Sequence, residues 1–165
     1  NSGNPDNTSA SSLITAVKEG VDAKTAFIIL SKRNRLETIA SKLVRDLIDR
    51  NALVAVAGLT GLGEDVPSDF ELATNLWMLD RTLPGEWIAE VQGLVTHIRT
   101  AKPAIPVCLI GMEGMAETAL LAAAVIDDVA GVAVDQPLAS YHDLISHTVC
   151  QTSTNCRMPP RAGRD

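Results

Sequence analysis

The sequence predicts an α/β fold, a three-layer sandwich in which helices cover both faces of a mostly parallel sheet. Four short apolar runs are spread along the chain, which is typical of strands that are buried on both faces. The segments between these runs place apolar residues at helical spacing, and each is long enough to hold a crossover helix. Right-handed crossovers of this kind produce a parallel sheet between two helical layers.

The composition is that of one globular domain, or of a large piece of one. The chain has 165 residues, of which 46% are hydrophobic and 21% are charged, with a formal net charge of −6. The apolar content excludes a disordered chain, and three cysteines are too few for a disulfide scaffold. An acidic chain without a basic stripe is not expected to bind nucleic acid. The longest uncharged apolar stretch, Thr118 to Ile126, is far shorter than the roughly 20 residues that cross a bilayer, so no membrane contact is expected.

Three segments are expected: a polar N-terminal segment over residues 1–24, an α/β domain over 25–148 and a polar tail over 149–165. The chain does not begin with Met, and its first residues lack the layout of a signal peptide. The possibility of a secreted or periplasmic protein that has lost its leader therefore stays open, as does the oligomeric state. Cys150 and Cys156 in the tail do not have a recognised zinc spacing, and we expect neither a metal nor a cofactor.

The first half of the domain predicts two strands joined by a helix. Ala26–Leu30 is the first apolar run, and Leu53–Ala57 is the second, ended by Gly58. Between them, apolar residues recur at intervals of three and four from Leu36 to Ile48. This spacing predicts one amphipathic helix between the two strands.

Two helical segments separate the second strand from the third. Helical spacing runs from Phe70 to Trp77 and resumes over Trp87–Ile98. Pro84-Gly85 is expected to interrupt it, because proline lacks a backbone N–H and glycine lacks a Cβ.

The last two strands are predicted at Ile105–Ile110 and Val129–Val134. The segment between them, Gly114–Ile126, is apolar nearly all round, which predicts a helix buried on several sides. No strand is predicted beyond Val134, so one edge of the sheet is expected to be bare. A bare edge favours association or poor solubility.

The loops that follow the strands are the candidate sites, because ligands of open parallel sheets gather at the carboxyl ends of the strands. The most distinctive loop is Gly111-Met112-Glu113-Gly114-Met115, between a buried strand and an apolar helix. A tight strand-to-helix turn needs small residues, and its central residue, Glu113, is expected to stand above the sheet beside the helix N-terminus. This is the geometry of a nucleophile elbow, G-x-S-x-G.

From about Ala26 to Ile145 the chain resembles the central half of an α/β-hydrolase, closest to acetyl-xylan-esterase-like hydrolases. Ala26–Leu30 is similar to the strand that precedes the oxyanion loop of that family. Leu53–Gly63 is similar to the next strand with its D-x-R-G-x-G loop, and Ile105–Met115 to the nucleophile strand and elbow. Further similarity runs through the helix and strand after the elbow, as far as Val134–Tyr141.

This resemblance implies a carboxylic-ester hydrolase acting on a small-molecule or carbohydrate ester. It implies catalytic positions at Glu113 and Asp135. The implied oxyanion or ligand loops contain Ser31, Gly61, Gly63 and Gly114.

The chain departs from the family pattern at the positions that carry the chemistry. Glu113 replaces the elbow serine and Met115 replaces the second glycine of the motif, while Gly58 and Thr60 replace the aspartate and arginine of the D-x-R-G-x-G loop. A serine mechanism needs a hydroxyl, a base and an acid that orients the base, and no complete triad is recognisable. We therefore expect an inactive or incomplete copy of such a hydrolase.

Two alternatives to that function stay open. One is a non-catalytic binding module on the same scaffold, and the other is a nucleotide-binding α/β domain that uses the glycine-rich loop Gly58–Gly63. Single residues also have two interpretations. Glu113 is either an unusual nucleophile or a carboxylate stabilised by the helix macrodipole, and Asp135 is either a triad acid or a turn residue before Pro137.

Overall fold

The computed structural model describes residues 13–16, 22–62, 69–138 and 140, and these form a five-stranded sheet. The strand order is β1-β3-β2-β4-β5. Strands β2 (Ala26–Ser31), β3 (Leu53–Ala57), β4 (Val107–Met112) and β5 (Val129–Val134) are parallel, and β1 (Leu13–Ala16) runs antiparallel to β3. The predicted α/β architecture with a mostly parallel sheet is confirmed.

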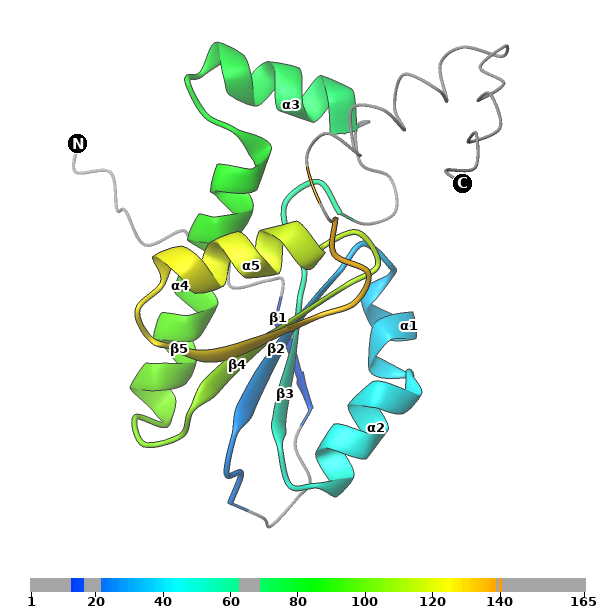
Figure 1. Cartoon of the computed structure of the whole chain (residues 1–165), viewed down its shortest axis with the longest axis vertical. Coiled ribbons are helices and arrows are strands. Elements are labelled where there is room, and N and C mark those ends of the chain that lie inside the picture. The colour runs from blue at the N-terminus through cyan, green and yellow to red at the C-terminus, as the bar shows by residue number, and fades with distance from the viewer. Residues whose placement is uncertain (1–12, 17–21, 63–68, 139, 141–165) are drawn as a thin grey trace, which may run out of the picture.

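Helices lie on both faces of this sheet, so the molecule has three layers (Figure 1). One face carries α1 (Arg35–Ile39) and α2 (Lys42–Asp49). The other face carries α4 (Leu83–Ala101) and α5 (Ala116–Val125), while α3 (Asp69–Met78) extends beyond the end of the sheet.

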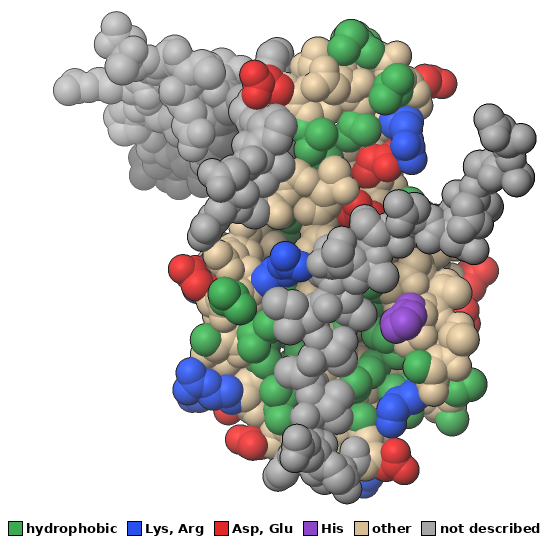
Figure 2. Space-filling model, turned by 180° about the vertical axis from the view of Figure 1, so that it is seen from behind, with side chains coloured by type: hydrophobic (Ala, Val, Ile, Leu, Met, Phe, Trp, Pro, Cys, Tyr) green, Lys and Arg blue, Asp and Glu red, His purple; other side chains and the backbone are tan. Residues whose placement is uncertain are grey.

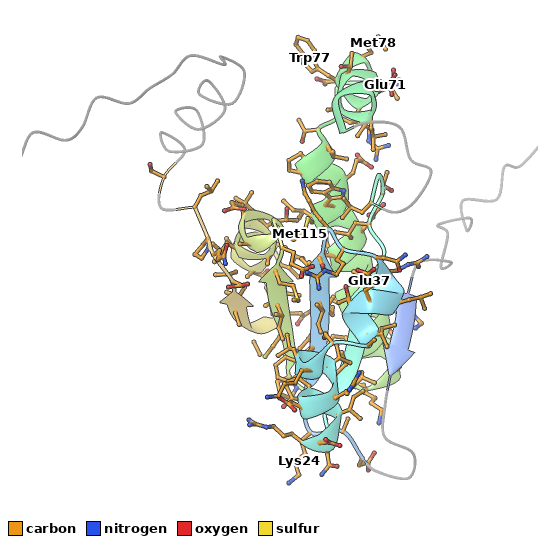
Figure 3. All side chains as sticks on the ribbon, turned by 90° about the vertical axis from the view of Figure 1, so that its right-hand side faces the viewer. Lys24, Glu37, Glu71, Trp77, Met78 and Met115 are labelled. Carbon is orange, nitrogen blue, oxygen red and sulfur yellow. The ribbon has the colours of Figure 1, made fainter. Side chains whose placement is uncertain are left out.

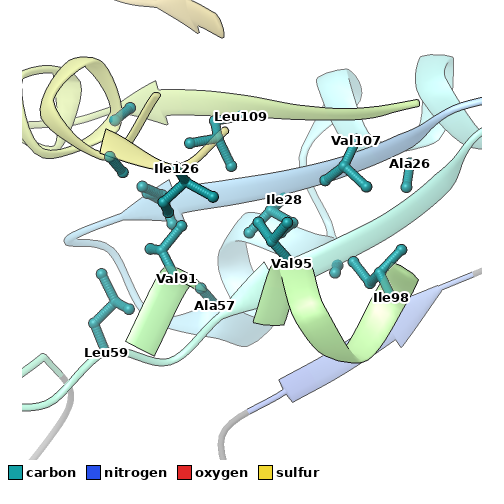
Figure 4. Packing of buried hydrophobic residues seen from close by; sticks show 14 of the residues in the cluster. Ala26, Ile28, Ala57, Leu59, Val91, Val95, Ile98, Val107, Leu109 and Ile126 are labelled. Carbon is teal, nitrogen blue, oxygen red and sulfur yellow. The ribbon is translucent and has the colours of Figure 1, made fainter. Parts of the chain in front are cut away.

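Alternating side chains of β2 fill the two interfaces between the sheet and the helices. Ile28 and Leu30 belong to the larger core cluster, which α4 and α5 cover, and Ile29 belongs to a smaller cluster with Val44 of α2. Figure 4 shows the larger cluster, in which Val91, Val95 and Ile98 of α4 lie against residues of β2, β3 and β4. Each large apolar side chain buried in this way contributes about 1.5–3 kcal/mol relative to an exposed one.

The prediction of a single helix from Leu36 to Ile48 is wrong, because the structure has two short helices there. Asn34 caps α1 by accepting a hydrogen bond from the Leu36 N–H, and Ser41 caps α2 by accepting one from the Val44 N–H. A serine that bonds the backbone in this way starts a new helix rather than continuing the old one. Leu36, in the first of these helices, is 69% exposed, although its spacing predicted a buried position.

The break between the next two helices also differs from the prediction. Helix α3 ends at Met78 and α4 begins at Leu83 behind the cap Thr82, so Pro84 and Gly85 lie in the first turn of α4 rather than in the break. Proline is tolerated there because the first N–H groups of a helix have no intrahelical partner. Trp77, which the spacing placed on an apolar face, is 78% exposed, and Figure 3 shows Trp77 and Met78 projecting from the far end of α3.

Helix α5 is buried on one face only, which corrects the prediction of burial on several sides. Ala119 and Ala122 are fully buried, whereas Leu121 is 40% exposed and Val125 is 66% exposed. Within the described residues, β5 is the last strand at its edge of the sheet, and Val132 on it is 38% exposed. The expected bare edge is therefore present in the part of the chain that the structure describes.

Sequence analysis gave no indication of strand β1. Its four residues fall in the segment that was expected to be a polar terminus, and they pair with β3 through Leu13↔Ala57 to Ala16↔Val54. Figure 2, a view from behind, shows hydrophobic side chains and charges of both signs spread over that face. No helix of the described residues is long and apolar enough to cross a membrane.

Candidate functional site

The chain order of the strands creates a switch point between β2 and β4. From β2 the chain passes to β3 on one side of it, and then returns to β4 on the other side. The connections leave β2 and β4 in opposite directions and on opposite faces of the sheet. The carboxyl ends of two strands that diverge in this way are where open α/β sheets bind their ligands. Ser31 pairs with Met112 at the end of the ladder, so the loops after both strands begin side by side.

The predicted elbow lies at this switch point. Strand β4 ends at Met112, α5 begins at Ala116, and the Met115 N–H donates to the Met112 carbonyl at 3.2 Å. Glu113 and Gly114 both have left-handed backbone, with φ of 53° and 86°. Left-handed backbone disfavours residues with a Cβ, so the glutamate at position 113 gains no stability from this conformation. The turn is therefore sharp, as the glycine spacing predicted.

Gly111 allows α5 to approach β4 closely. A Cβ at this position would lie 2.6 Å from the Ala119 Cβ, 2.6 Å from the Met115 carbonyl oxygen and 3.0 Å from the Ala116 Cα. Only glycine fits at that separation, which gives a physical reason for the first glycine of the motif. Met115, which stands where the family has its second glycine, is fully buried in the larger core cluster.

The Glu113 carboxylate binds two side chains of the loop that follows β2. The Ser31 hydroxyl donates to Oε2 at 2.7 Å, and Arg33 Nη2 forms an ion pair with Oε1 at 2.6 Å. The Glu113 side chain is 25% exposed, so the carboxylate lies at the end of the sheet and not in the packed interior. Sequence analysis predicted this position for residue 113, while its catalytic role stays a prediction.

Ser31 is held in a fixed position for this contact. It is only 4% exposed, and its Oγ also accepts a hydrogen bond from the Arg33 N–H at 3.0 Å. The Arg33 side chain is 54% exposed, and its Nε lies 3.9 Å from the Glu37 carboxylate, a longer contact than the one that its Nη2 makes with Glu113. Sequence analysis did not single out Arg33, because nothing local marks a residue whose partner is far away along the chain.

The glycine-rich loop after β3 is attached to α4. The Thr60 N–H donates to Glu90 Oε2 at 2.9 Å and its hydroxyl also donates to the Glu90 carboxylate, while Trp87 Nε1 donates to the Thr60 carbonyl at 2.7 Å. Gly61 has a φ of 80°, and a Cβ there would lie 2.2 Å from Leu72 Cδ2. Gly63 lies outside the described residues. Two donors of this loop, the Thr60 N–H and hydroxyl, already bind a carboxylate, which counts against the nucleotide-binding alternative.

Asp135 is placed near the elbow by its backbone. Its N–H donates to the Gly111 carbonyl at 2.9 Å, which extends the β4–β5 ladder, and its side chain is exposed. Gln136 follows with a φ of 50°, and the Leu138 N–H donates to Glu117 Oε1 at 2.7 Å. Among the described residues no hydrogen bond or ion pair joins Asp135 to Glu113 or Ser31, so the structure does not assemble them into a dyad.

No group of three or more His, Cys, Asp or Glu side chains that could hold a metal ion occurs in the described part of the chain. Cys150 and Cys156 lie outside that part, so the expectation for the tail stays a prediction. The described cysteine, Cys108, lies on β4, and burial raises the pKa of its thiol.

Comparisons with known proteins identify the fold. The sequence matches no protein-family model and no curated protein. It is similar in structure to a cold-adapted esterase from an Arctic intertidal metagenomic library, with a TM-score of 0.60 and 11% identity, over 76% of this chain and 54% of that one. The chain has part of the α/β-hydrolase fold.

A second solved structure, an a/b serine hydrolase without lid from Xanthomonas campestris, matches with a TM-score of 0.45 and 15% identity, over 70% of this chain and 51% of that one. The chain thus spans about half the length of both hydrolases. At 11% identity, the likeness to the cold-adapted esterase establishes the α/β-hydrolase fold alone. The activity of this chain has to be argued from its own residues.

Proposed function

We propose that the chain is an α/β-hydrolase-like protein related to carboxylic-ester hydrolases of the acetyl-xylan-esterase type, and that it does not hydrolyse esters. The observation that carries the proposal is the state of the elbow side chain. Both carboxylate oxygens of Glu113 are bound, one by the Ser31 hydroxyl at 2.7 Å and one by the Arg33 guanidinium at 2.6 Å.

A nucleophile has to present an electron pair to the substrate in a near-attack position. Glu113 would first have to leave its two partners, which hold it with charge-assisted hydrogen bonds. Glutamate is also one methylene longer than aspartate, the carboxylate that related elbows use, and a misplacement of about 1 Å can cost on the order of a hundredfold in rate. Direct attack by Glu113 is therefore not supported.

Ser31 carries a hydroxyl at this end of the sheet, and its environment argues against a serine mechanism. Its proton points to the Glu113 carboxylate, and Arg33 engages that same carboxylate. Proton transfer to Glu113 would leave the guanidinium beside a neutral acid and would give up the ion pair. Among the described residues no histidine hydrogen-bonds to Ser31, so the imidazole base of a Ser-His-Asp triad is not present around it.

Hydrolysis of p-nitrophenyl acetate tests the proposal, with acetate release from acetylated xylan oligosaccharides as the second substrate. We expect the wild type, Glu113→Ala and Ser31→Ala to release p-nitrophenol at the same low rate as the urea-unfolded chain. Asp135→Ala is the matched control, because its exposed side chain contacts neither Glu113 nor Ser31. Circular dichroism confirms that each variant is folded.

A clear rate for the wild type that Glu113→Ala abolishes would refute the proposal and establish a carboxylate mechanism. Loss of such a rate in Ser31→Ala but not in Glu113→Ala would refute it in favour of a serine nucleophile. Equal loss in Asp135→Ala would restore the predicted triad role of that residue.

A further inference from the structure

We infer that Ser31 and Arg33 form a binding site for a small carboxylate, and that Glu113 occupies this site as an internal ligand. Two donors converge on one carboxyl group: a hydroxyl at 2.7 Å from one oxygen and a guanidinium nitrogen at 2.6 Å from the other. The inference rests on the proposed function in one respect, namely that residue 113 is not a nucleophile.

The donor set matches a carboxylate better than other ligands. Arginine presents its N–H groups in a planar fork that suits a planar carboxyl group, and it stays charged at all relevant pH values. The second donor is a fixed neutral hydroxyl, since Ser31 is 4% exposed and its Oγ already accepts from the Arg33 N–H. One cation and one hydroxyl suit a single negative charge, which favours a monocarboxylate over a phosphate.

The internal ligand can be displaced because it is not deeply buried. The Glu113 side chain is 25% exposed and the Arg33 side chain is 54% exposed, so solvent reaches the pair. A carboxylate from solution can make the same two contacts once the Glu113 side chain has swung out.

The position of the site indicates the source of its ligand. It lies at the carboxyl ends of β2 and β4, where open α/β sheets bind their ligands. A carboxylic acid is what an ester hydrolase releases, so the proposed site would bind the class of compound that related active enzymes produce. In this chain Glu113 would keep that site closed until such an acid is abundant.

Thermal unfolding in sodium acetate and in sodium benzoate tests the inference, with sodium chloride at equal ionic strength as the reference. Glu113→Gly empties the site and suits the left-handed backbone. At ten times the Kd, acetate or benzoate should raise the Tm of Glu113→Gly by roughly 3 to 6 °C above the chloride value. The wild type should need at least about tenfold more ligand for the same shift, because its own carboxylate is held at a high local concentration.

Two further variants assign the effect to Arg33 and Ser31 rather than to general charge. Glu113→Gly combined with Arg33→Met should lose the shift. Glu37→Gln is the matched control, since Glu37 is the distant, 67% exposed partner of the same arginine, and its removal should leave the wild-type behaviour unchanged. If Glu113→Gly does not fold, Glu113→Gln replaces it, because an amide leaves only one acceptor oxygen and competes less with acetate.

A folded Glu113 variant that shows no shift with acetate or benzoate would overturn the inference. So would a shift that persists after Arg33→Met, or one that Glu37→Gln produces to the same extent as the Glu113 variants. These outcomes are separate from the proposed function, which fails only if the wild type hydrolyses esters.

Discussion

Replacing Gly111 with alanine tests the close contact between β4 and α5 on which the elbow depends. The added Cβ would lie 2.6 Å from both the Ala119 Cβ and the Met115 carbonyl oxygen and 3.0 Å from the Ala116 Cα, and these atoms cannot rotate away as the end of a long side chain could. Helix α5 would have to move away from the sheet by several tenths of an ångström. We expect the elbow to lose its shape along with part of the stability.

The expected change in the free energy of unfolding of Gly111→Ala follows from two opposing effects. Overpacking a well-packed interior costs about 1–3 kcal/mol, and a clash with backbone falls at the upper end of that range. Replacing glycine with alanine recovers about 0.4–1 kcal/mol by restricting the unfolded chain. The net loss for Gly111→Ala is therefore about 2 kcal/mol, or roughly 4 to 8 °C in Tm for a chain of this size.

Gly131 provides the matched control, because it lies on the neighbouring strand β5. A Cβ there would meet only the Cys108 Sγ, at an ordinary contact distance of 3.7 Å. Gly131→Ala should therefore be neutral or stabilising by up to about 1 kcal/mol. Urea unfolding followed by circular dichroism gives both free energies, with equal m-values as the condition for comparison. A loss below about 0.5 kcal/mol for Gly111→Ala, or equal losses in the two variants, would refute the close packing at the elbow.

Three other predictions concern the turn, the partly buried thiol of Cys108 and the exposed edge. Gly114 has a φ of 86°, so its replacement with alanine should lower the free energy of unfolding by about 1–2 kcal/mol, and its replacement with asparagine should lower it by less. The same urea unfolding measures both values, and equal losses would contradict the role of the Gly114 backbone conformation. Burial raises the pKa of the Cys108 thiol, so little thiolate is present near neutral pH, and iodoacetamide should label it several-fold more slowly than in the urea-unfolded chain, as mass spectrometry would show. The folded-state rate should rise with pH later than that of the unfolded chain, and identical pH profiles would contradict the raised pKa. The exposed apolar residues of α5 and β5 should cause association that Val125→Glu reduces and Val125→Ile does not, and a monomeric wild type in light scattering would contradict this.

The buried strands and the elbow could be predicted from the sequence because both have local signatures. A strand covered on both faces shows a continuous apolar run, and Leu53–Ala57 is buried along its whole length, as that pattern predicts. The sharp turn after β4 needs glycine at Gly111 for contact and at Gly114 for backbone conformation. Such requirements concern neighbouring residues, so they can be recognised without knowledge of the tertiary structure.

The contacts that define the site could not be predicted in the same way. Ser31 and Glu113 are separated by 82 positions, and only the adjacency of β2 and β4 brings them together. Strand β1 was missed for the same reason, since four residues become a strand only by pairing with β3. The end of the first helix was missed because Ser41 fits the helical spacing as well as it fits a cap.

The location of the site and its chemistry therefore have different origins in this protein. The strand order places the loops after β2 and β4 side by side whatever residues they contain, which is why an α/β-hydrolase-like sheet leads to the switch point. The chemistry depends on three side chains that are complementary to one another. A glutamate at the elbow without Arg33 would leave a half-buried carboxylate without this counter-charge, and Arg33 without Glu113 would leave a cation without its close partner. Because each compensates the other, the two residues act as a unit, and removing Glu113 alone is expected to turn a closed ion pair into an open receptor for an acid.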